Sequence, residues 1–393
     1  MRAFQNKIKN IKFIKNSICL CCGKKLRKAI NLPNFPVTEF YVRDTEKINK
    51  NYLIDQAYLF CNNCKHLTIS KTLDPNFIYS NYTAVSGNSQ GAYKCLKNFH
   101  TFFKKDKISL FDCNIIDIGG NDSSFLKFFK VKNRVNIDPN ARSDEKKIKI
   151  YKTFFDKIDF SRFKSKKKNI FFSSHTLEHL EKPQDLIKKI SKNMKDKDKL
   201  YLQFPCLERL ILKQRFDQLC HQHLNFFSIN SINKLLNLNH LYINRYEYDD
   251  SHFGTLRIMA AKKIRTIKFK ENNIDLENIK KSFFLFRSKC RIFNKKKLKK
   301  LIHGQGFGAG ILVPVLNYFL PSINNLKYIF DDNHDKLNKK FVTMKPTIVS
   351  SKKINLNEPI IITSISSKMA TRNIFAKLKK IGAKKIIVPR LSV

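Results

Sequence analysis

The chain has 393 residues, 42% of them hydrophobic, and a formal net charge of +46 from 77 Lys and Arg against 31 Asp and Glu. This length allows two or three domains, and the Lys- and Asn-rich start lacks the apolar run of a secretory signal. The long uncharged span 301–326 is interrupted by Gly and Pro, which excludes a membrane span and favours a cytoplasmic protein.

The positive charge is mostly Lys and is spread over every segment, together with abundant Asn, Ile and Phe, as AT-rich coding would produce. A nucleic-acid binder would gather its cations on one face or motif. No interleaved basic and aromatic motif of the RNA-recognition type is present. We therefore expect no nucleic-acid partner and interpret the surplus as solvated surface.

Four of the ten cysteines form two C-x-x-C knuckles, Cys19 with Cys22 and Cys61 with Cys64, separated by 38 residues. Each knuckle places two thiolates on one side of a tetrahedral ion, so the pair predicts a closed zinc site with a structural role. Cys21 is an additional thiol beside the first knuckle. Unrelated free thiols are the alternative interpretation.

From about residue 105 short apolar runs alternate with helical segments, which is typical of a parallel sheet covered by helices. The strand 114–118 contains Asp117 and leads into a turn of Gly119, Gly120 and Asn121. Asp138 ends the next strand, 21 residues after Asp117. Such a turn admits a ligand close to the backbone, and the second acid accepts ribose hydroxyls, so we expect these residues to bind a nucleotide-like cofactor.

The next strand, 169–174, leads into His175-Thr-Leu-Glu178-His179. The pattern His-x-x-Glu-His also matches an inverted zinc-protease motif. We do not adopt that interpretation, because the segment continues the sheet of the two acids and no further ligand follows it. We expect His175 to line the cofactor pocket.

In their order, these motifs resemble the three-domain sugar C-methyltransferase family, which uses S-adenosylmethionine and acts on nucleotide-linked keto-deoxy sugars. The resemblance spans nearly the whole chain, although Ser123 replaces a glycine of the cofactor turn. The matching stretches are the two knuckles, 32–36, 82–89, 117–122, 216–228, 252–257, 304–310 and 328–336.

The resemblance implies that His223 is the catalytic base, while Cys220 and Gln222 stand where the family has Tyr and Glu. Methylation of a carbon beside a ketone needs a base for the α proton and donors for the enolate oxygen. His223 has the right chemistry for the first task. We expect His221 or Gln222 to orient it or to stabilise the enolate.

The resemblance also implies a nucleotide-sugar site shared with the C-terminal part. Phe253 replaces a family glycine, Gly310 replaces a lysine, and the family's Trp-Asn segment has no counterpart because the chain has no Trp. The residues expected to bind the substrate are Tyr82, His252, Arg257, Gly304, Gly306 and Asp331.

The expected fold is α/β, with a Rossmann-like class I methyltransferase domain between an N-terminal zinc-binding module and a C-terminal α/β substrate-binding domain. The expected bounds are 1–75 for the zinc module, 76–104 for a connector, 105–265 for the methyltransferase domain, 266–299 for a helical link and 300–393 for the C-terminal domain.

Three alternatives remain open at the level of sequence. Gly304-x-Gly306-x-x-Ala309, with Asp331 and Asp332 downstream, also fits an NAD-dependent oxidoreductase. The methyl acceptor could be an oxygen or nitrogen in glycan biosynthesis. The departures at Cys220, Gln222 and Gly310 are also compatible with a binding protein that has lost catalysis.

Overall fold

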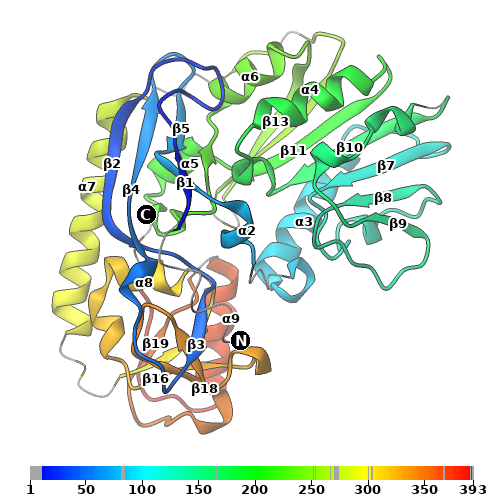
Figure 1. Ribbon diagram of the computed structural model, residues 1–393. Helices are drawn as coiled ribbons and strands as arrows, with labels where there is room; N and C mark the ends of the chain where they lie inside the picture. Colours follow the sequence, from blue (N-terminus) through cyan, green and yellow to red (C-terminus); the bar gives the residue numbers. More distant parts are fainter. Residues whose placement is uncertain are drawn as a thin grey trace.

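The structure is a computed structural model, and it describes residues 11–80, 85–164, 166–250, 252, 254–265, 267–269, 274–299, 301, 304–365, 368–389 and 391. Figure 1 shows two lobes, one built from the middle of the chain and one in which N-terminal and C-terminal segments lie together. Within the described residues, no helix is long and apolar enough to cross a membrane.

The first lobe is organised by a seven-stranded sheet in the order β13-β14-β11-β10-β7-β8-β9. Its strands are β7 (Cys113–Ile118), β8 (Arg134–Ile137), β9 (Ile148–Tyr151), β10 (Lys168–Ser174), β11 (Lys199–Pro205), β13 (Tyr242–Asp249) and β14 (Thr255–Ala261). The pairs from β11 to β9 are parallel, whereas β14 runs antiparallel to both of its neighbours. The strand order reverses between β7 and β10, where sheets of this kind bind ligands beyond the carboxyl ends of the strands.

Helices cover both faces of this sheet, which explains its continuous apolar strands. On one face, α3 (Gln90–Lys104) buries Leu96, Phe99, Phe102 and Phe103, whose spacing forms one helical stripe. On the other face lie α4 (Pro183–Asn193) and α6 (Ile229–Asn237). The Ser89 hydroxyl caps α3 by accepting a hydrogen bond from the backbone of Ala92.

The second lobe contains a four-stranded antiparallel sheet in the order β12-β5-β4-β2. Its N-terminal strands are β2 (Arg27–Pro36), β4 (Leu53–Cys61) and β5 (His66–Ile69), and a small ribbon pairs β1 (Phe13–Lys15) with β6 (Lys71–Leu73). The fourth strand, β12 (Asn225–Phe226), comes from the predicted methyltransferase segment. The N-terminal sheet is therefore completed by the middle of the chain.

The C-terminal sheet also has seven strands, in the order β20-β19-β15-β16-β18-β17-β3. They are β3 (Tyr41–Arg43), β15 (Gln305–Phe307), β16 (Tyr328–Asp331), β17 (Lys339–Phe341), β18 (Thr347–Ser350), β19 (Ile360–Ile362) and β20 (Ile386–Ile387). Its edge strand β3 belongs to the segment that the sequence assigned to the zinc module. The predicted bounds at 75 and 300 thus divide segments that pair in one sheet.

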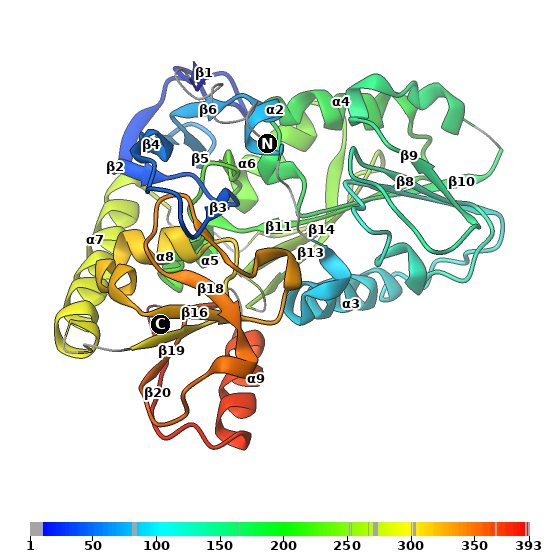
Figure 2. The ribbon, with the colours of Figure 1, turned by 60° about the horizontal axis from the view of Figure 1, so that its bottom comes forward.

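One hydrophobic core joins these two sheets. It takes in β2, β4, β5 and the helices α5 (Leu207–Leu212), α7 (Leu276–Phe293) and α8 (Val313–Phe319), and it continues into β16 and β18. The other α-helices of the described residues are the four-residue α2 (Pro75–Ile78) and α9 (Lys368–Lys380). Figure 2 shows α7 and α8 between the N-terminal strands and the C-terminal sheet.

Candidate active site

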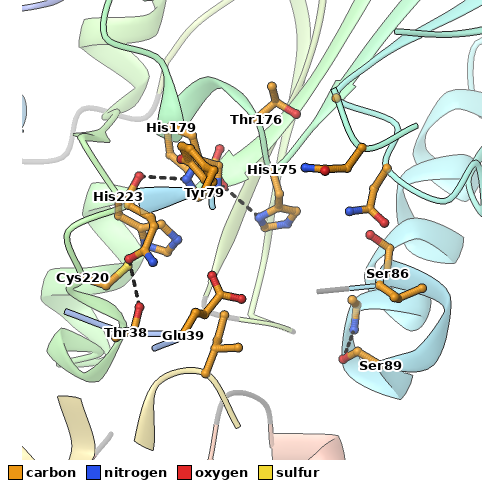
Figure 3. Close-up of a pocket in the computed structure, with 18 of the residues that line it drawn as sticks. Thr38, Glu39, Tyr79, Ser86, Ser89, His175, Thr176, His179, Cys220 and His223 are labelled. Carbon is orange, nitrogen blue, oxygen red and sulfur yellow. Dashed lines mark hydrogen bonds and ion pairs between the residues drawn. The ribbon is translucent and has the colours of Figure 1, made fainter. Parts of the chain in front are cut away.

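A cavity of about 830 Å³ lies at the carboxyl ends of the strands of the first lobe and extends to the second lobe. Its walls come from three parts of the chain: the loops after β7, β8 and β10, the segment 217–223, and turns of the N- and C-terminal segments. Figure 3 shows the side chains of these parts pointing toward a common space.

The glycine turn after β7 forms the cofactor side of this cavity. Gly119 has φ +79°, and a Cβ there would lie 1.9 Å from Thr176 Oγ1. A Cβ on Gly120 would lie 2.5 Å from Asn136 Oδ1. The sequence therefore needs glycine at both positions, and the backbone is open to a ligand that packs against it.

The two predicted acids line the same side. Asp117 is 1% exposed, and its Oδ1 has no hydrogen-bond partner among the described residues. Burial, reinforced by the charges of Asp138 and Asp122, raises the pKa of Asp117 to about 8. Asp138 accepts hydrogen bonds from the backbone of Asn121 (3.1 Å) and Asn140 (2.6 Å), while burial raises its pKa.

These features fit a nucleoside cofactor with a cationic tail. The turn offers close approach, Asp138 stands where ribose hydroxyls are accepted, and the buried Asp117 oxygen lacks a donor. Ser86 and Ser89, at the start of α3, line the cavity as well. The sequence analysis did not select these two serines, since small polar residues before a helix are ordinary capping residues.

His175 lies in the same wall, after β10, with φ +52°. Its Nδ1 lies 3.2 Å from Glu178 Oε1, and its Nε2 lies 3.6 Å from Cys95 Sγ. Burial and the charge of Arg257 lower the pKa of His175 to about 4. His175 is therefore a neutral imidazole at neutral pH.

His223 faces the other half of the cavity, close to His179, with ring centroids 5.1 Å apart. Burial, and then the neighbouring His179 and His175, lower the pKa of His223 well below the usual value for histidine. The ring is therefore neutral at neutral pH, and a neutral imidazole can accept a proton.

Of the two residues expected to assist His223, only Gln222 lies in the cavity wall. Its Oε1 accepts a hydrogen bond from Thr38 Oγ1 at 3.0 Å. His221 points into the second lobe, where its Nδ1 lies 3.2 Å from Gln56 Nε2 and its Nε2 lies 3.2 Å from the Phe35 carbonyl. Because successive side chains in this loop point in different directions, His221 packs in the core of the second lobe and does not line the cavity.

The residues expected to bind the substrate are not gathered in one place. His252 lines the cavity, whereas Tyr82 lies outside the described residues. Gly304 and Gly306 pack against Leu326 in the C-terminal sheet, and Asp331 accepts hydrogen bonds from the backbone of Ala309 and Asn333. None of these last three lines the cavity.

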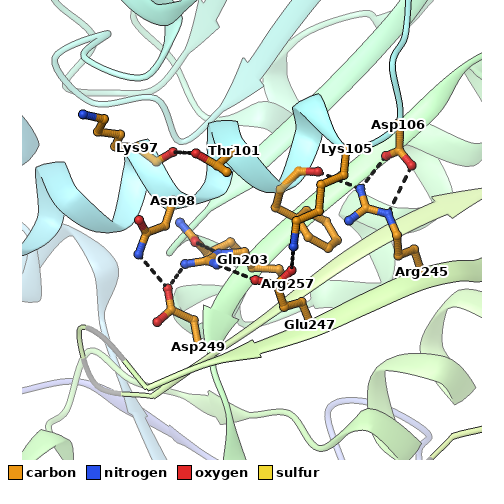
Figure 4. Close-up of polar contacts among 11 residues, drawn as sticks. Lys97, Asn98, Thr101, Lys105, Asp106, Gln203, Arg245, Glu247, Asp249 and Arg257 are labelled. Carbon is orange, nitrogen blue, oxygen red and sulfur yellow. Dashed lines mark hydrogen bonds and ion pairs between the residues drawn. The ribbon is translucent and has the colours of Figure 1, made fainter.

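Arg257 belongs to a buried polar network between α3 and the strands β13 and β14, shown in Figure 4. It donates to Gln203 Oε1 at 2.9 Å and pairs with Asp249 and with Glu247. Asn98 of α3 donates to the same Asp249 carboxylate at 3.1 Å. Arg257 does not line the cavity, and these hydrogen-bond partners all belong to the first lobe, so its expected role in substrate binding stays a prediction.

Several residues of the acceptor side were missed by the sequence analysis. Glu39 is 1% exposed, has φ +65° and faces the cavity from the loop between β2 and β3. Lys336 reaches the cavity from the C-terminal segment and donates to the Ala309 carbonyl at 2.8 Å. No local motif marks these residues, because the chain brings them together only through the shared core of the second lobe.

Away from the cavity, the four knuckle cysteines form a cluster whose sulfurs all lie within 4.8 Å of one another. Cys19 and Cys64 sulfurs are 3.6 Å apart, as are those of Cys22 and Cys61. A tetrahedral zinc ion with bonds of about 2.3 Å would separate its sulfurs by about 3.8 Å, so this donor set fits the ion. Cys21 is not one of these four ligands, and its thiol donates to the Ser231 carbonyl at 3.2 Å.

Residues 88–243, from just before α3 into β13, match the family model of a methyltransferase domain. This part of the chain is a methyltransferase domain. The expected Rossmann-like class I methyltransferase fold is thereby confirmed, with the strand order described above. No curated protein sequence matches the chain.

Three solved structures illustrate the likeness. Magnesium protoporphyrin IX methyltransferase from Synechocystis PCC 6803 has 13% identity and a TM-score of 0.34, over 48% of this chain and 92% of that one. A Pyrococcus horikoshii OT3 protein has 13% identity and a TM-score of 0.37, over 47% and 98%. An S-adenosylmethionine-dependent methyltransferase from Clostridium acetobutylicum ATCC 824 has 10% identity and a TM-score of 0.31, over 47% and 94%.

Proposed function

We propose that this chain transfers a methyl group from S-adenosylmethionine to a carbon of a nucleotide-linked keto-deoxy sugar, with His223 as the general base. The observation that carries the proposal is a neutral, buried imidazole in the same cavity as the glycine turn and the acid Asp138. The likeness of the motif order to sugar C-methyltransferases supports the choice of acceptor.

In this proposal the chain's residues align the reactants and move one proton. S-adenosylmethionine supplies an electrophilic methyl group when bound. Asp138 accepts the ribose hydroxyls, and the Gly119 turn lets the backbone close on the cofactor. His223 takes the proton from the carbon beside the ketone, and that carbon's electron pair forms the new carbon–carbon bond while the sulfur–methyl bond breaks. His223 then releases the proton to solvent.

Both lobes contribute to acceptor binding in this proposal. Glu39 offers a buried carboxylate that accepts hydrogen bonds from sugar hydroxyl or amino groups. Lys336 brings a cation to the cavity wall, where it suits the diphosphate of the nucleotide. Gln222 and His252 face the same space and can hold the enolate oxygen through their N–H groups.

We further propose that Cys19, Cys22, Cys61 and Cys64 bind a structural zinc ion. Four thiolates leave no open coordination position, so the ion has no part in the chemistry. The site fastens the N-terminal sheet to the first lobe, since Gln184 donates to the Cys21 carbonyl at 2.6 Å and Cys21 contacts α6.

A panel of nucleotide-linked keto sugars, incubated with the protein and S-adenosylmethionine, tests the proposal by mass spectrometry. We expect a gain of one methyl group, located on carbon by fragmentation. His223→Ala should lower kcat by about 100-fold or more, whereas His334→Ala, at an exposed position, should leave it unchanged. Methylation on oxygen or nitrogen, or full activity of His223→Ala, would refute the carbon-acid mechanism, and tight NADH binding without S-adenosylmethionine binding would refute the methyltransferase assignment.

A further inference from the structure

Three side chains, one of them the proposed base His223, form a cluster with the composition of a metal site. The ligand atoms of Glu178, His179 and His223 all lie within 4.8 Å of one another in the cavity wall. Glu178 and His179 follow β10, and His223 comes from the loop before β12, 44 residues later in the chain. The fold therefore adds His223 to the last two residues of the motif His-x-x-Glu-His, whereas His175, its first residue, is not part of the cluster.

The orientation of His179 is fixed by the backbone. Its Nδ1 donates a hydrogen bond to the Gln222 carbonyl at 2.8 Å. This bond places the proton on Nδ1 and leaves the Nε2 lone pair available on the side of Glu178, whose Oε1 lies 4.0 Å away. A ring held in this way by a carbonyl is the usual arrangement of metal-binding histidines.

Glu178 provides a second, independent indication. The residue is 1% exposed, and its Oε2 has no hydrogen-bond partner among the described residues. A buried carboxylate oxygen without a donor is costly, and a cation beside it would remove that cost.

Two imidazoles and one carboxylate are the ligands of open, four-coordinate zinc sites and also suit other divalent transition metals. Bonds of about 2.0–2.2 Å require donor atoms about 3.3 Å apart, so the side chains must close by about 1.5 Å or less from the 4.8 Å limit.

We propose that Glu178, His179 and His223 form a second metal site, separate from the four cysteines, which binds a divalent transition metal such as Zn²⁺. An imidazole nitrogen that coordinates a metal cannot accept a proton at the same time. Metal binding therefore withdraws His223 from proton transfer and inhibits the enzyme. This inhibitory consequence rests on the proposed function, whereas the metal site itself does not.

Metal counting tests the site without any substrate. The full-length protein is stripped with a chelator, reloaded with Zn²⁺, freed of excess metal by gel filtration and analysed by elemental mass spectrometry. We expect wild type and His334→Ala to bind one more zinc ion per protein molecule than His179→Ala and Glu178→Gln do. S-adenosylhomocysteine binding and the melting temperature show whether each variant is folded. Two variants are used so that the test still works if one of them does not fold.

Equal zinc content in wild type and in both folded variants would overturn the proposal. For the inhibitory step, Zn²⁺ should inhibit methylation by wild type and should inhibit His179→Ala at least about 10-fold more weakly. Equal inhibition of the two proteins would refute the inhibitory role. If no sugar in the panel is methylated, the proposed function fails, and the zinc counts still decide whether the site exists.

Discussion

The most direct test of the cofactor half of the cavity is the removal of the Asp138 carboxylate. In Asp138→Ala the ribose hydroxyls lose two acceptor oxygens. A hydrogen bond to a charged group contributes about 1.5–3 kcal/mol, and part of that is recovered by water because Asp138 is incompletely buried. We expect a net loss of about 2–4 kcal/mol in cofactor binding, which corresponds to a rise in Kd of about 30- to 1000-fold.

Isothermal titration with S-adenosylhomocysteine measures this loss without turnover. Asp138→Asn should lie between wild type and Asp138→Ala, because it keeps one acceptor oxygen but places an amide against the backbone N–H of Asn121 or Asn140. Asp144→Ala removes an exposed carboxylate of the same lobe that pairs with Lys127, and it should bind normally. An Asp138→Ala protein that melts like wild type and binds within about two-fold of it would show that the cofactor ribose lies elsewhere.

Three further predictions concern charge and metal. Because the pKa of Asp117 is raised to about 8 in the folded protein, the native state retains a proton that the unfolded state loses. The melting temperature of ligand-free wild type should fall from pH 5 to pH 8 more than that of Asp117→Asn, and parallel curves would contradict this. Arg257→Ala leaves the partly buried Asp249 carboxylate without its cation and should cost about 2 kcal/mol of stability in urea unfolding. A folded, equally stable Arg257→Ala protein with a raised KM for the acceptor would instead support the predicted role of Arg257 in substrate binding. Cys22→Ser should lower both the zinc content and the melting temperature, whereas Cys113→Ser should keep its zinc; unchanged zinc in Cys22→Ser would refute the four-cysteine site.

The cofactor half of the site could be anticipated from sequence because its determinants are local. Asp117, Gly119 and Gly120 lie within four consecutive positions, and the strand before them fixes their direction. Asp138 follows the neighbouring parallel strand, so both acids must reach the same edge of the sheet. The spacing of Asp117 and Asp138 along the chain is therefore enough to predict that they lie close together in the fold.

The acceptor half could not be derived in the same way. His221 and His223 are two residues apart in a loop, and no periodicity indicates which of them faces the cavity. The choice is made by contacts across the chain, with Gln56 for His221 and with His179 for His223. Arg257 lies on β14, where its side chain could serve the cavity or the core, and the acids of β13 draw it into the core.

Strand pairing across the predicted domain bounds has a related physical cause. The segment 37–40 leaves β2 in the N-terminal sheet and enters β3 at the edge of the C-terminal sheet. It carries Thr38 and Glu39 into the cavity on the way, and Thr38 holds Gln222 beside the proposed base. The position of this segment is therefore set by both sheets together, and Cys61 of the four-cysteine cluster lies at the end of β4 in one of them. If the cluster binds zinc as proposed, the ion stabilises the N-terminal sheet and, through the segment 37–40, the acceptor wall, without a part in the chemistry.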